Sequence, residues 1–174
     1  MSTQIVGAVD DSGAAFHCNY AHTLEPLTMD SARGLLELRN QDGVRKRFRS
    51  AQQISQSQHE RWLLRYLKRE HDQMWVLLCN RRIIGAAALY EMNSEKGEAT
   101  FGRLMTDPRA RTTHRGAGRM MLRHAIQFAI NSGIRTLSLE VQSNNDHAIF
   151  LYASEGFVCT SSKDGYLNMM RQAR

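Results

Sequence analysis

The segment THRGAGRMML, residues 113–122, places Gly116 and Gly118 among basic residues and directly before an apolar run. A glycine turn that opens a helix presents unpaired backbone N–H groups at the positive end of the helix dipole, which favours a bound anion. Glycine also lets the backbone approach a phosphate closely, because it carries no Cβ. The segment therefore predicts a phosphate cradle, with a plain glycine turn as the alternative.

Two common phosphate-binding motifs do not fit this segment. A P-loop ends in Lys followed by Ser or Thr, and that pair is missing here. The dinucleotide fingerprint G-x-G-x-x-G needs a third glycine where this chain has Met121. The interpretation of the segment therefore depends on the elements that surround it.

Hydrophobic periodicity predicts one α/β (α+β) domain over residues 1–174, in the order β-α-α-β-β-β-α-β-α-β-β. Strands are expected at 16–28, 74–79, 83–92, 99–106, 134–141, 157–162 and 166–172, and helices at 29–40, 54–70, 116–132 and 146–155. Three strands in direct succession exclude a doubly wound parallel sheet and favour a mixed, mostly antiparallel sheet flanked by helices. Residues 1–15 are expected to be poorly ordered.

Signals for helix ends accompany these segments. The expected N-caps are Thr28 or Asp30, Ser55 or Ser57, and Asn144 or Asn145, and the expected stops are Gly133 and Gly156. The clearest apolar helix face, in 54–70, is formed by Trp62, Leu63, Tyr66 and Leu67.

Composition indicates a globular protein, with 42% hydrophobic and 23% charged residues among 174. No apolar run approaches the roughly 20 residues that span a bilayer, and the N-terminal segment lacks a secretory-signal pattern. We therefore expect a cytoplasmic protein that does not insert into membranes. Its three cysteines, Cys18, Cys79 and Cys159, are far apart, which predicts ordinary reduced thiols rather than disulfides or a metal site.

The net charge of +6 leaves three classes of partner open: nucleic acid, an anionic membrane or a phosphorylated small molecule. The densest basic run is VRKRFRS, residues 44–50, which is equally compatible with a solvated surface. No helix-turn-helix, zinc-finger or RNP pattern is present in the sequence, so we expect no nucleic-acid partner.

A second motif, LEVQSNNDHAIFLYASEGF at 139–157, begins about 25 residues after the start of the glycine segment. Together the two resemble the GNAT acetyltransferase superfamily, over residues 74–160. The glycine segment is similar to the family's Q/R-x-x-G-x-G/A. The second motif is similar to its Leu-x-Val signature, and the matching residues are Leu139, Val141, Asn145, Ala148, Tyr152, Gly156 and Phe157.

The resemblance implies a GNAT-like fold, acetyl-CoA as co-substrate and no metal. The residues implied to bind acetyl-CoA are Leu104, Met105, Arg111, Thr113, His114, Arg115, Gly116, Ala117, Gly118, Arg119, Asn145 and Tyr152. Thr113 departs from the usual Gln or Arg, and Arg111 or Arg115 would replace that side chain. A backbone N–H near Leu104 or Met105 would polarise the thioester carbonyl. For Asn145, a pure helix cap is the alternative.

For catalysis, the resemblance implies that Tyr152 protonates the departing thiolate. The alternative is a tyrosine packed in the core. The general base stays open among Glu91, Glu98, His59 and Glu140, with Glu98 and His59 preferred. For His59 the alternative is a structural histidine.

The acceptor side is expected in the first half of the chain. Its residues Arg39, Asn40, Val44, Arg45, Ile54, Ser55, His59 and Trp62 resemble the branch that acetylates nucleotide-linked amino sugars for surface glycans. The resemblance implies a substrate site at Arg39, Asn40, Arg45, His59 and Trp62, and guanidinium groups suit a diphosphate. The alternatives are a protein N-terminus, a ribosomal protein, a small amine, or a non-catalytic acetyl-CoA-binding regulator. An exposed strand edge at 166–172 would permit a homodimer.

Overall fold

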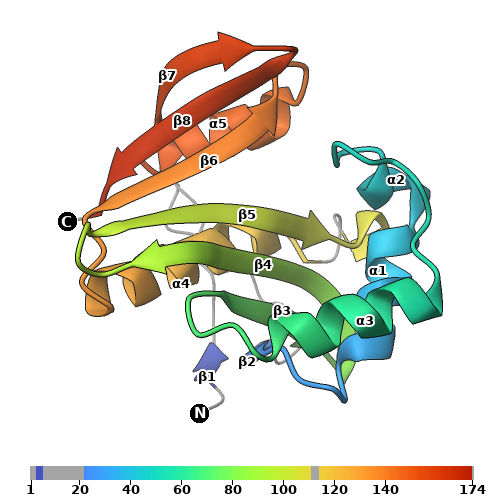
Figure 1. Ribbon diagram of the computed structural model, residues 1–174. Coiled ribbons are helices and arrows are strands. Elements are labelled where there is room, and N and C mark those ends of the chain that lie inside the picture. The colour runs from blue at the N-terminus through green and yellow to red at the C-terminus, as the bar shows by residue number, and fades with distance from the viewer. Residues whose placement is uncertain (1–2, 6–21, 111–113, 174) are drawn as a thin grey trace.

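The computed structural model describes residues 3–5, 22–110 and 114–173, which form a sheet with helices on both faces (Figure 1). The strands are β1 Thr3–Ile5, β2 His22–Pro26, β3 Gln73–Cys79, β4 Arg82–Asn93, β5 Glu98–Thr106, β6 Thr136–Gln142, β7 Val158–Lys163 and β8 Tyr166–Gln172. The helices are α1 Ala32–Asn40, α2 Asp42–Arg45, α3 Gln56–Tyr66, α4 Ala117–Asn131 and α5 Asp146–Ser154, with a 3-10 turn at Pro108–Ala110.

The strand order is β1-β2-β3-β4-β5-β6-β8-β7. All neighbours pair antiparallel except β5 and β6, which are parallel, so the predicted mixed and mostly antiparallel sheet is confirmed. The expected order gains three short elements: β1, the single turn α2 and the 3-10 turn. The predicted free edge at 166–172 is wrong, because β8 lies between β6 and β7, and β7 is the edge strand. The homodimer stays a prediction.

Alternation along β3 divides the core into two layers. Successive side chains of a strand point to opposite faces of the sheet. Trp75 and Leu77 therefore pack with the apolar face of α4, whereas Met74 and Val76 pack with α1 and α3. Figure 1 shows the same division, with α4 behind β4 and β5 and with α3 in front.

The ends of the helices follow local chemistry. Ser55 begins α3 through a capping box, in which its Oγ accepts from the Gln58 N–H at 3.3 Å and its own N–H donates to Gln58 at 2.8 Å. The predicted caps Thr28 and Asp30 are wrong for α1, since Ser31 holds the cap position and bonds back to Thr28. Leu67 is 45% exposed and lies beyond the end of α3, so it does not belong to the apolar face.

The sheet opens between β5 and β6. These strands pair only over Glu98–Thr100 and Thr136–Ser138 and then diverge (Figure 1). On its other side β5 carries a bulge, because Gly102 and Met105 lie opposite Ala88 and Ala86, which leaves one extra residue on β5. Arg103, within the bulge, has a φ of +54°. No described helix is both long and apolar enough to cross a membrane.

Candidate active site

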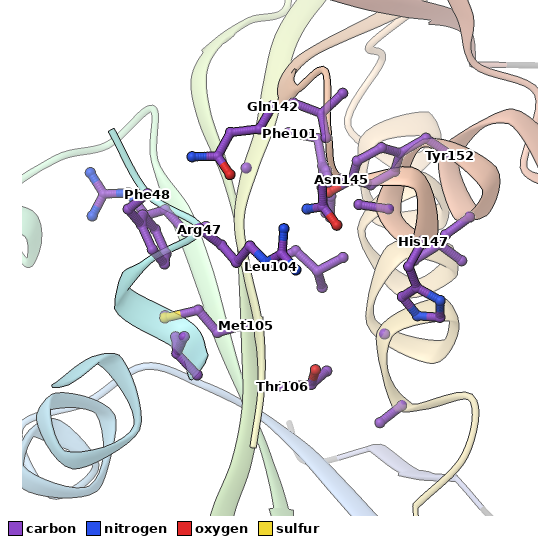
Figure 2. Close-up of a pocket in the computed structure, with 18 of the residues that line it drawn as sticks. Arg47, Phe48, Phe101, Leu104, Met105, Thr106, Gln142, Asn145, His147 and Tyr152 are labelled. Carbon is purple, nitrogen blue, oxygen red and sulfur yellow. The ribbon is translucent and has the colours of Figure 1, made fainter. Parts of the chain in front are cut away.

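A cavity of about 640 Å³ lies between the diverging strands. Figure 2 shows Leu104, Met105 and Thr106 along β5, with Arg47 and Phe48 on one side of the strand. Residues of β6 and α5 form the other side, with Tyr152, Asn145 and His147 among them. The cavity therefore has one wall from the second motif and another from the basic run after α2.

The cavity exposes a backbone edge of β5. In the described chain, no strand pairs with β5 on its β6 side beyond Thr100, although β5 continues to Thr106. Leu104 and Met105 lie on this unpaired stretch and line the cavity. Such an edge can bind an extended ligand arm through main-chain hydrogen bonds, as an added strand would.

The glycine segment forms the end of the cavity that suits an anion. Gly116 is the N-cap of α4 at φ +82°, a left-handed conformation that favours glycine. Arg115, Gly116, Ala117 and Gly118 line the cavity at this helix start, where backbone N–H groups lack helical partners. The geometry therefore fits the phosphate cradle that the sequence predicts.

Gly118 keeps this end of the cavity open. A Cβ at this position would lie 3.6 Å from Leu151, 3.9 Å from Thr106 and 4.0 Å from Leu104, and all three residues line the cavity. A side chain larger than a methyl group would therefore fill space between β5 and α5.

Nine of the residues implied to bind acetyl-CoA meet in this cavity. They are Leu104, Met105, His114, Arg115, Gly116, Ala117, Gly118, Asn145 and Tyr152. Arg111 and Thr113 lie outside the described residues. Asn145 is the N-cap residue of α5 but makes no side-chain cap bond within the described chain, which argues against the pure-cap alternative.

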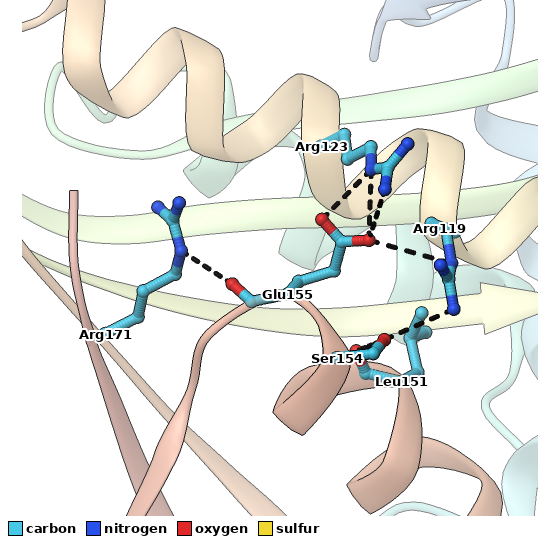
Figure 3. Close-up of polar contacts among 6 residues, drawn as sticks. All are labelled: Arg119, Arg123, Leu151, Ser154, Glu155 and Arg171. Atoms are coloured by element: carbon cyan, nitrogen blue, oxygen red, sulfur yellow. Dashed lines mark hydrogen bonds and ion pairs between the residues drawn. The ribbon is translucent and has the colours of Figure 1, made fainter. Parts of the chain in front are cut away.

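Arg119 is placed differently from the expectation. It does not line the cavity and lies 3.6 Å from Glu155, and its Nη2 donates to Ser154 at 3.2 Å (Figure 3). Arg123 donates to the same carboxylate at 3.0 Å, and Arg171 donates to the Glu155 carbonyl at 2.7 Å. Arg119 therefore ties α4 to the end of α5, and it supports the helix that carries Tyr152.

Tyr152 is 7% exposed and lines the cavity from α5. Its ring meets Phe101 edge-on at 6.1 Å and Phe157 at 6.0 Å. Burial raises the pKa of the Tyr152 hydroxyl, and the neighbouring Tyr90 raises it further. The phenol consequently keeps its proton at physiological pH, as a general acid must.

The structure does not bring the two preferred bases to the cavity. Glu98 is exposed at the start of β5, and six residues of strand, about 20 Å, separate it from Leu104. His59 is 5% exposed in the core between α1 and α3, with its ring 5.3 Å from that of Trp62. Burial lowers the pKa of His59, which disfavours its charged form, and His59 does not line the cavity.

The other two candidates for the base are also engaged elsewhere. Glu91 lies outside the cavity lining and accepts from the Thr100 hydroxyl at 3.4 Å. Glu140 does line the cavity, but it accepts from Arg49 Nε at 2.9 Å.

The residues expected to bind the acceptor support a loop instead. Arg39 donates to the Ser50 carbonyl at 2.9 Å, and Arg45 donates to the Ala51 carbonyl. Asn40 exchanges two hydrogen bonds of 2.8 Å with the backbone of Ile54. Backbone groups of an irregular loop need such partners. Like His59 and Trp62, these three side chains do not line the cavity.

Six further residues that line the cavity were not predicted as site residues. Arg47, Phe48 and Arg49 come from the basic run at 44–50, and Tyr90, Arg103 and Tyr166 come from strands. The basic run was the available signal, although it was equally compatible with a solvated surface.

Arg103 is the most distinctive of these residues. Its guanidinium carbon lies 5.1 Å from the Trp62 ring centre and 6.0 Å from that of Tyr90, in cation–π geometry. Among the described residues, no carboxylate oxygen lies within 4.0 Å of its guanidinium nitrogens. Arg103 lines the cavity, and burial lowers the pKa of its guanidinium although Tyr90 and Asp72 act in the opposite direction.

Asp107 anchors the end of β5 to the turn that leads into the glycine segment. It is 2% exposed and accepts from the Arg109 backbone N–H at 2.9 Å and from Arg82 at 3.0 Å. Burial by itself would raise the pKa of Asp107, but hydrogen bonds from Arg109 outweigh it and hold the pKa below its ordinary value of 3.8.

We expect Asp107→Asn to lower the free energy of unfolding at pH 7 by about 1–3 kcal/mol, because it removes a buried charge-assisted network. Since the folded-state pKa is depressed, this stabilisation is complete above pH 3.8 and is lost as the pH falls below it. Urea unfolding between pH 3 and pH 7 measures both effects. The exposed Asp30→Asn is the charge-matched control. Identical acid sensitivity in wild type and Asp107→Asn would contradict the prediction.

Comparisons with known proteins agree with this geometry. The sequence model of the acetyltransferase (GNAT) family matches residues 36–157. A [ribosomal protein bS18]-alanine N-acetyltransferase of Salmonella typhimurium is 45% identical over 60 residues, which cover 34% of this chain and 39% of that relative. The matched stretch thus spans well under half of the relative's length.

Solved structures share the fold over most of their length. Spermidine N-acetyltransferase from Vibrio cholerae, in complex with CoA and spermine, has a TM-score of 0.74 at 20% identity, over 87% of this chain and 95% of that one. The ribosomal-protein-S18-alanine N-acetyltransferase from Escherichia coli has a TM-score of 0.67 at 23% identity, over 87% and 94%. The chain belongs to the acetyltransferase (GNAT) family, which supports acetyl-CoA as its acetyl donor.

Proposed function

We propose that this protein transfers an acetyl group from acetyl-CoA to a primary amine on a small anionic acceptor. One observation carries the proposal: the unpaired edge of β5, the glycine start of α4 and the Tyr152 hydroxyl converge on a single cavity. When bound, acetyl-CoA supplies an activated thioester. The backbone from Arg115 to Gly118 would hold its pyrophosphate, and the edge at Leu104 and Met105 would hold its extended arm.

Separate groups of the protein then carry out the individual steps of acetyl transfer. A backbone N–H in the bulged stretch of β5 polarises the acyl carbonyl, and Tyr152 donates its proton to the departing sulfur. Arg47 and Arg103 favour the neutral form of the acceptor amine, because nearby positive charge lowers the pKa of an ammonium group. This effect supports proton loss to solvent without a dedicated carboxylate base.

Charge and aromatic surface support an anionic acceptor with a planar ring. Arg47 and Arg103 can bind phosphate or carboxylate groups. Phe48 and Tyr166 also line the cavity, and a base would stack on the ring face opposite the one that Arg39 or Arg49 covers. A nucleotide-linked amino sugar combines these features. Arg39, Asn40 and Arg45, which carry the resemblance to that branch, hold the loop that presents Arg47 and Phe48.

A second candidate acceptor is the N-terminal amine of a protein. The observation that favours it is the similarity to the Salmonella relative, whose name specifies the alanine of ribosomal protein bS18. A peptide amine would use the same acetyl-CoA site and Tyr152, so the two candidates differ only in the acceptor.

Thiol release from acetyl-CoA separates these candidates. The purified protein is offered a UDP-linked 4-amino sugar, a peptide with N-terminal alanine, and spermidine. We expect turnover with the nucleotide-linked amino sugar and competition by UDP. Faster turnover with the peptide would identify a protein N-terminus as the acceptor instead. Acetyl-CoA binding without turnover of any amine would support the non-catalytic alternative.

We expect Arg103→Gln to raise the KM for an anionic acceptor by about 10- to 100-fold, since a charged hydrogen bond contributes about 1.5–3 kcal/mol. The KM for acetyl-CoA should change little, because the variant keeps the bulge and most of the side-chain stem. Initial rates at varied acceptor concentration measure the effect. Arg33→Gln removes an exposed arginine and is the matched control. An equal effect on a neutral amine acceptor would contradict the assignment.

A further inference from the structure

Three residues with metal-binding side chains meet beside the glycine segment. His22, Cys79 and His114 each offer one ligand atom, and these atoms all lie within 4.8 Å of one another. His22 Nε2 and His114 Nδ1 are 2.9 Å apart, with the two rings edge to face. The three residues are far apart in the sequence, so no motif with metal-ligand spacing predicts the cluster.

The fold fixes the positions of all three residues. His22 begins β2 and Cys79 ends β3, and the antiparallel register places them directly opposite each other. His114 lies two residues before Gly116, and its backbone N–H donates to Ala110 at 2.7 Å. Cys79 is 6% exposed, and the two histidines are half-buried. The three side chains are therefore partly or fully shielded from solvent, unlike a chance grouping of residues on an exposed surface.

Thiolate and imidazole are the ligands that zinc prefers. Tetrahedral zinc binds them at about 2.0–2.3 Å, which places ligand atoms roughly 3.3–3.8 Å apart. In the cluster, the two histidine nitrogens are 2.9 Å apart, and all three ligand atoms lie within 4.8 Å of one another. Side-chain rotations that move the ligand atoms by about 1 Å would give the spacing that zinc requires. Three protein ligands leave a fourth position for water.

We propose that His22, Cys79 and His114 form a zinc site that fastens the start of the glycine segment to the β2–β3 edge. His114 also lines the cavity, so a bound ion would restrict the backbone that leads into Gly116. Zinc binding would then tighten acetyl-CoA, because a fixed loop loses less freedom when the ligand binds. This consequence rests on the proposed function, whereas the metal site itself does not.

The test uses the full chain after treatment with a chelator. Titration with ZnCl₂ is expected to show one tight equivalent, confirmed by elemental analysis. Co²⁺ in place of zinc gives a thiolate charge-transfer band only if a cysteine binds the metal. A Cys18→Ser/Cys159→Ser protein leaves Cys79 as the only thiol, since the chain has three cysteines. The band should persist in this protein.

Cys79→Ser and His22→Gln should each abolish tight zinc binding, and Cys159→Ser should retain it. Tight zinc binding that survives both substitutions, or a Co²⁺ spectrum without a thiolate band, overturns the site. If either variant does not fold, the Co²⁺ spectrum of the Cys18→Ser/Cys159→Ser protein still decides.

Acetyl-CoA affinity is measured separately, with and without zinc. We expect about 3- to 10-fold tighter binding with zinc in the wild type, within the usual range of coupling between sites. No such change is expected in Cys79→Ser. Tight zinc binding with no acetyl-CoA binding at all would uphold the metal site and contradict the proposed function.

Discussion

Tyr152→Phe is expected to lower kcat by about 10²–10⁴-fold, the usual contribution of a positioned general acid. The variant keeps the ring that packs between Phe101 and Phe157 and removes only the proton donor. The KM for acetyl-CoA should therefore stay close to that of the wild type. Thiol release at saturating substrates, with acetyl-CoA affinity measured by calorimetry, separates the two parameters.

Tyr66→Phe is the matched control for this loss of a buried hydroxyl. The Tyr66 hydroxyl accepts a hydrogen bond from the Met74 N–H at 2.8 Å and does not line the cavity. Removing it should lower the free energy of unfolding by about 1–3 kcal/mol, because a buried N–H is left unsatisfied. Its kcat should stay near that of the wild type. A similar loss of activity in both variants would indicate a packing role for Tyr152.

The pH profile gives an independent readout of the same hydroxyl. Burial raises the pKa of Tyr152 above its ordinary value, so the active, protonated form persists as the pH rises toward 10. The wild-type kcat should increase as the acceptor amine loses its proton and should show no decline up to that pH. A falling limb between pH 8 and pH 9 would contradict the assignment of Tyr152 as the acid.

Much of the fold could be predicted because its signals are local. The apolar run of β3, the capping residue Ser55 and the glycine start of α4 each depend on a few neighbouring residues. The end of the cavity formed by the glycine segment and Tyr152 was predictable for the same reason. One motif opens α4 and the other runs from β6 through α5, and each is short enough to be recognised without knowledge of the tertiary structure.

The side of the cavity lined by the basic run and Arg103 could not be predicted in this way. In a sequence, an arginine that binds a substrate looks the same as one that binds a loop carbonyl. Arg39 and Arg45 bind loop carbonyls. Glu98 lies outside the cavity because it is at the exposed start of β5, and the part of β5 that lines the cavity begins at Phe101. Arg103 depends on a bulge in the β4–β5 register, which no local pattern announces.

The second large effect is expected at Gly118, where stability and ligand binding should change in opposite directions. Gly118→Ala replaces a glycine in the first turn of α4, which should raise the free energy of unfolding by about 0.5–1 kcal/mol. The added methyl group would make ordinary contacts with Leu151, Thr106 and Leu104. Acetyl-CoA should bind more weakly to the variant, because this methyl group occupies cavity space. Calorimetry and thermal unfolding on the same samples measure both quantities.

Gly118→Val extends the series, because two further methyl groups project between β5 and α5. Overpacking costs about 1–3 kcal/mol, so the Kd for acetyl-CoA should rise by about 10- to 100-fold. The free protein should remain folded, since the extra atoms enter a cavity rather than a filled core. A graded loss of affinity from glycine through alanine to valine, with no parallel loss of stability, is specific for a ligand that occupies this space. Unchanged affinity in Gly118→Val would mean that acetyl-CoA does not pass between the glycine segment and β5, and the proposed site would then be wrong.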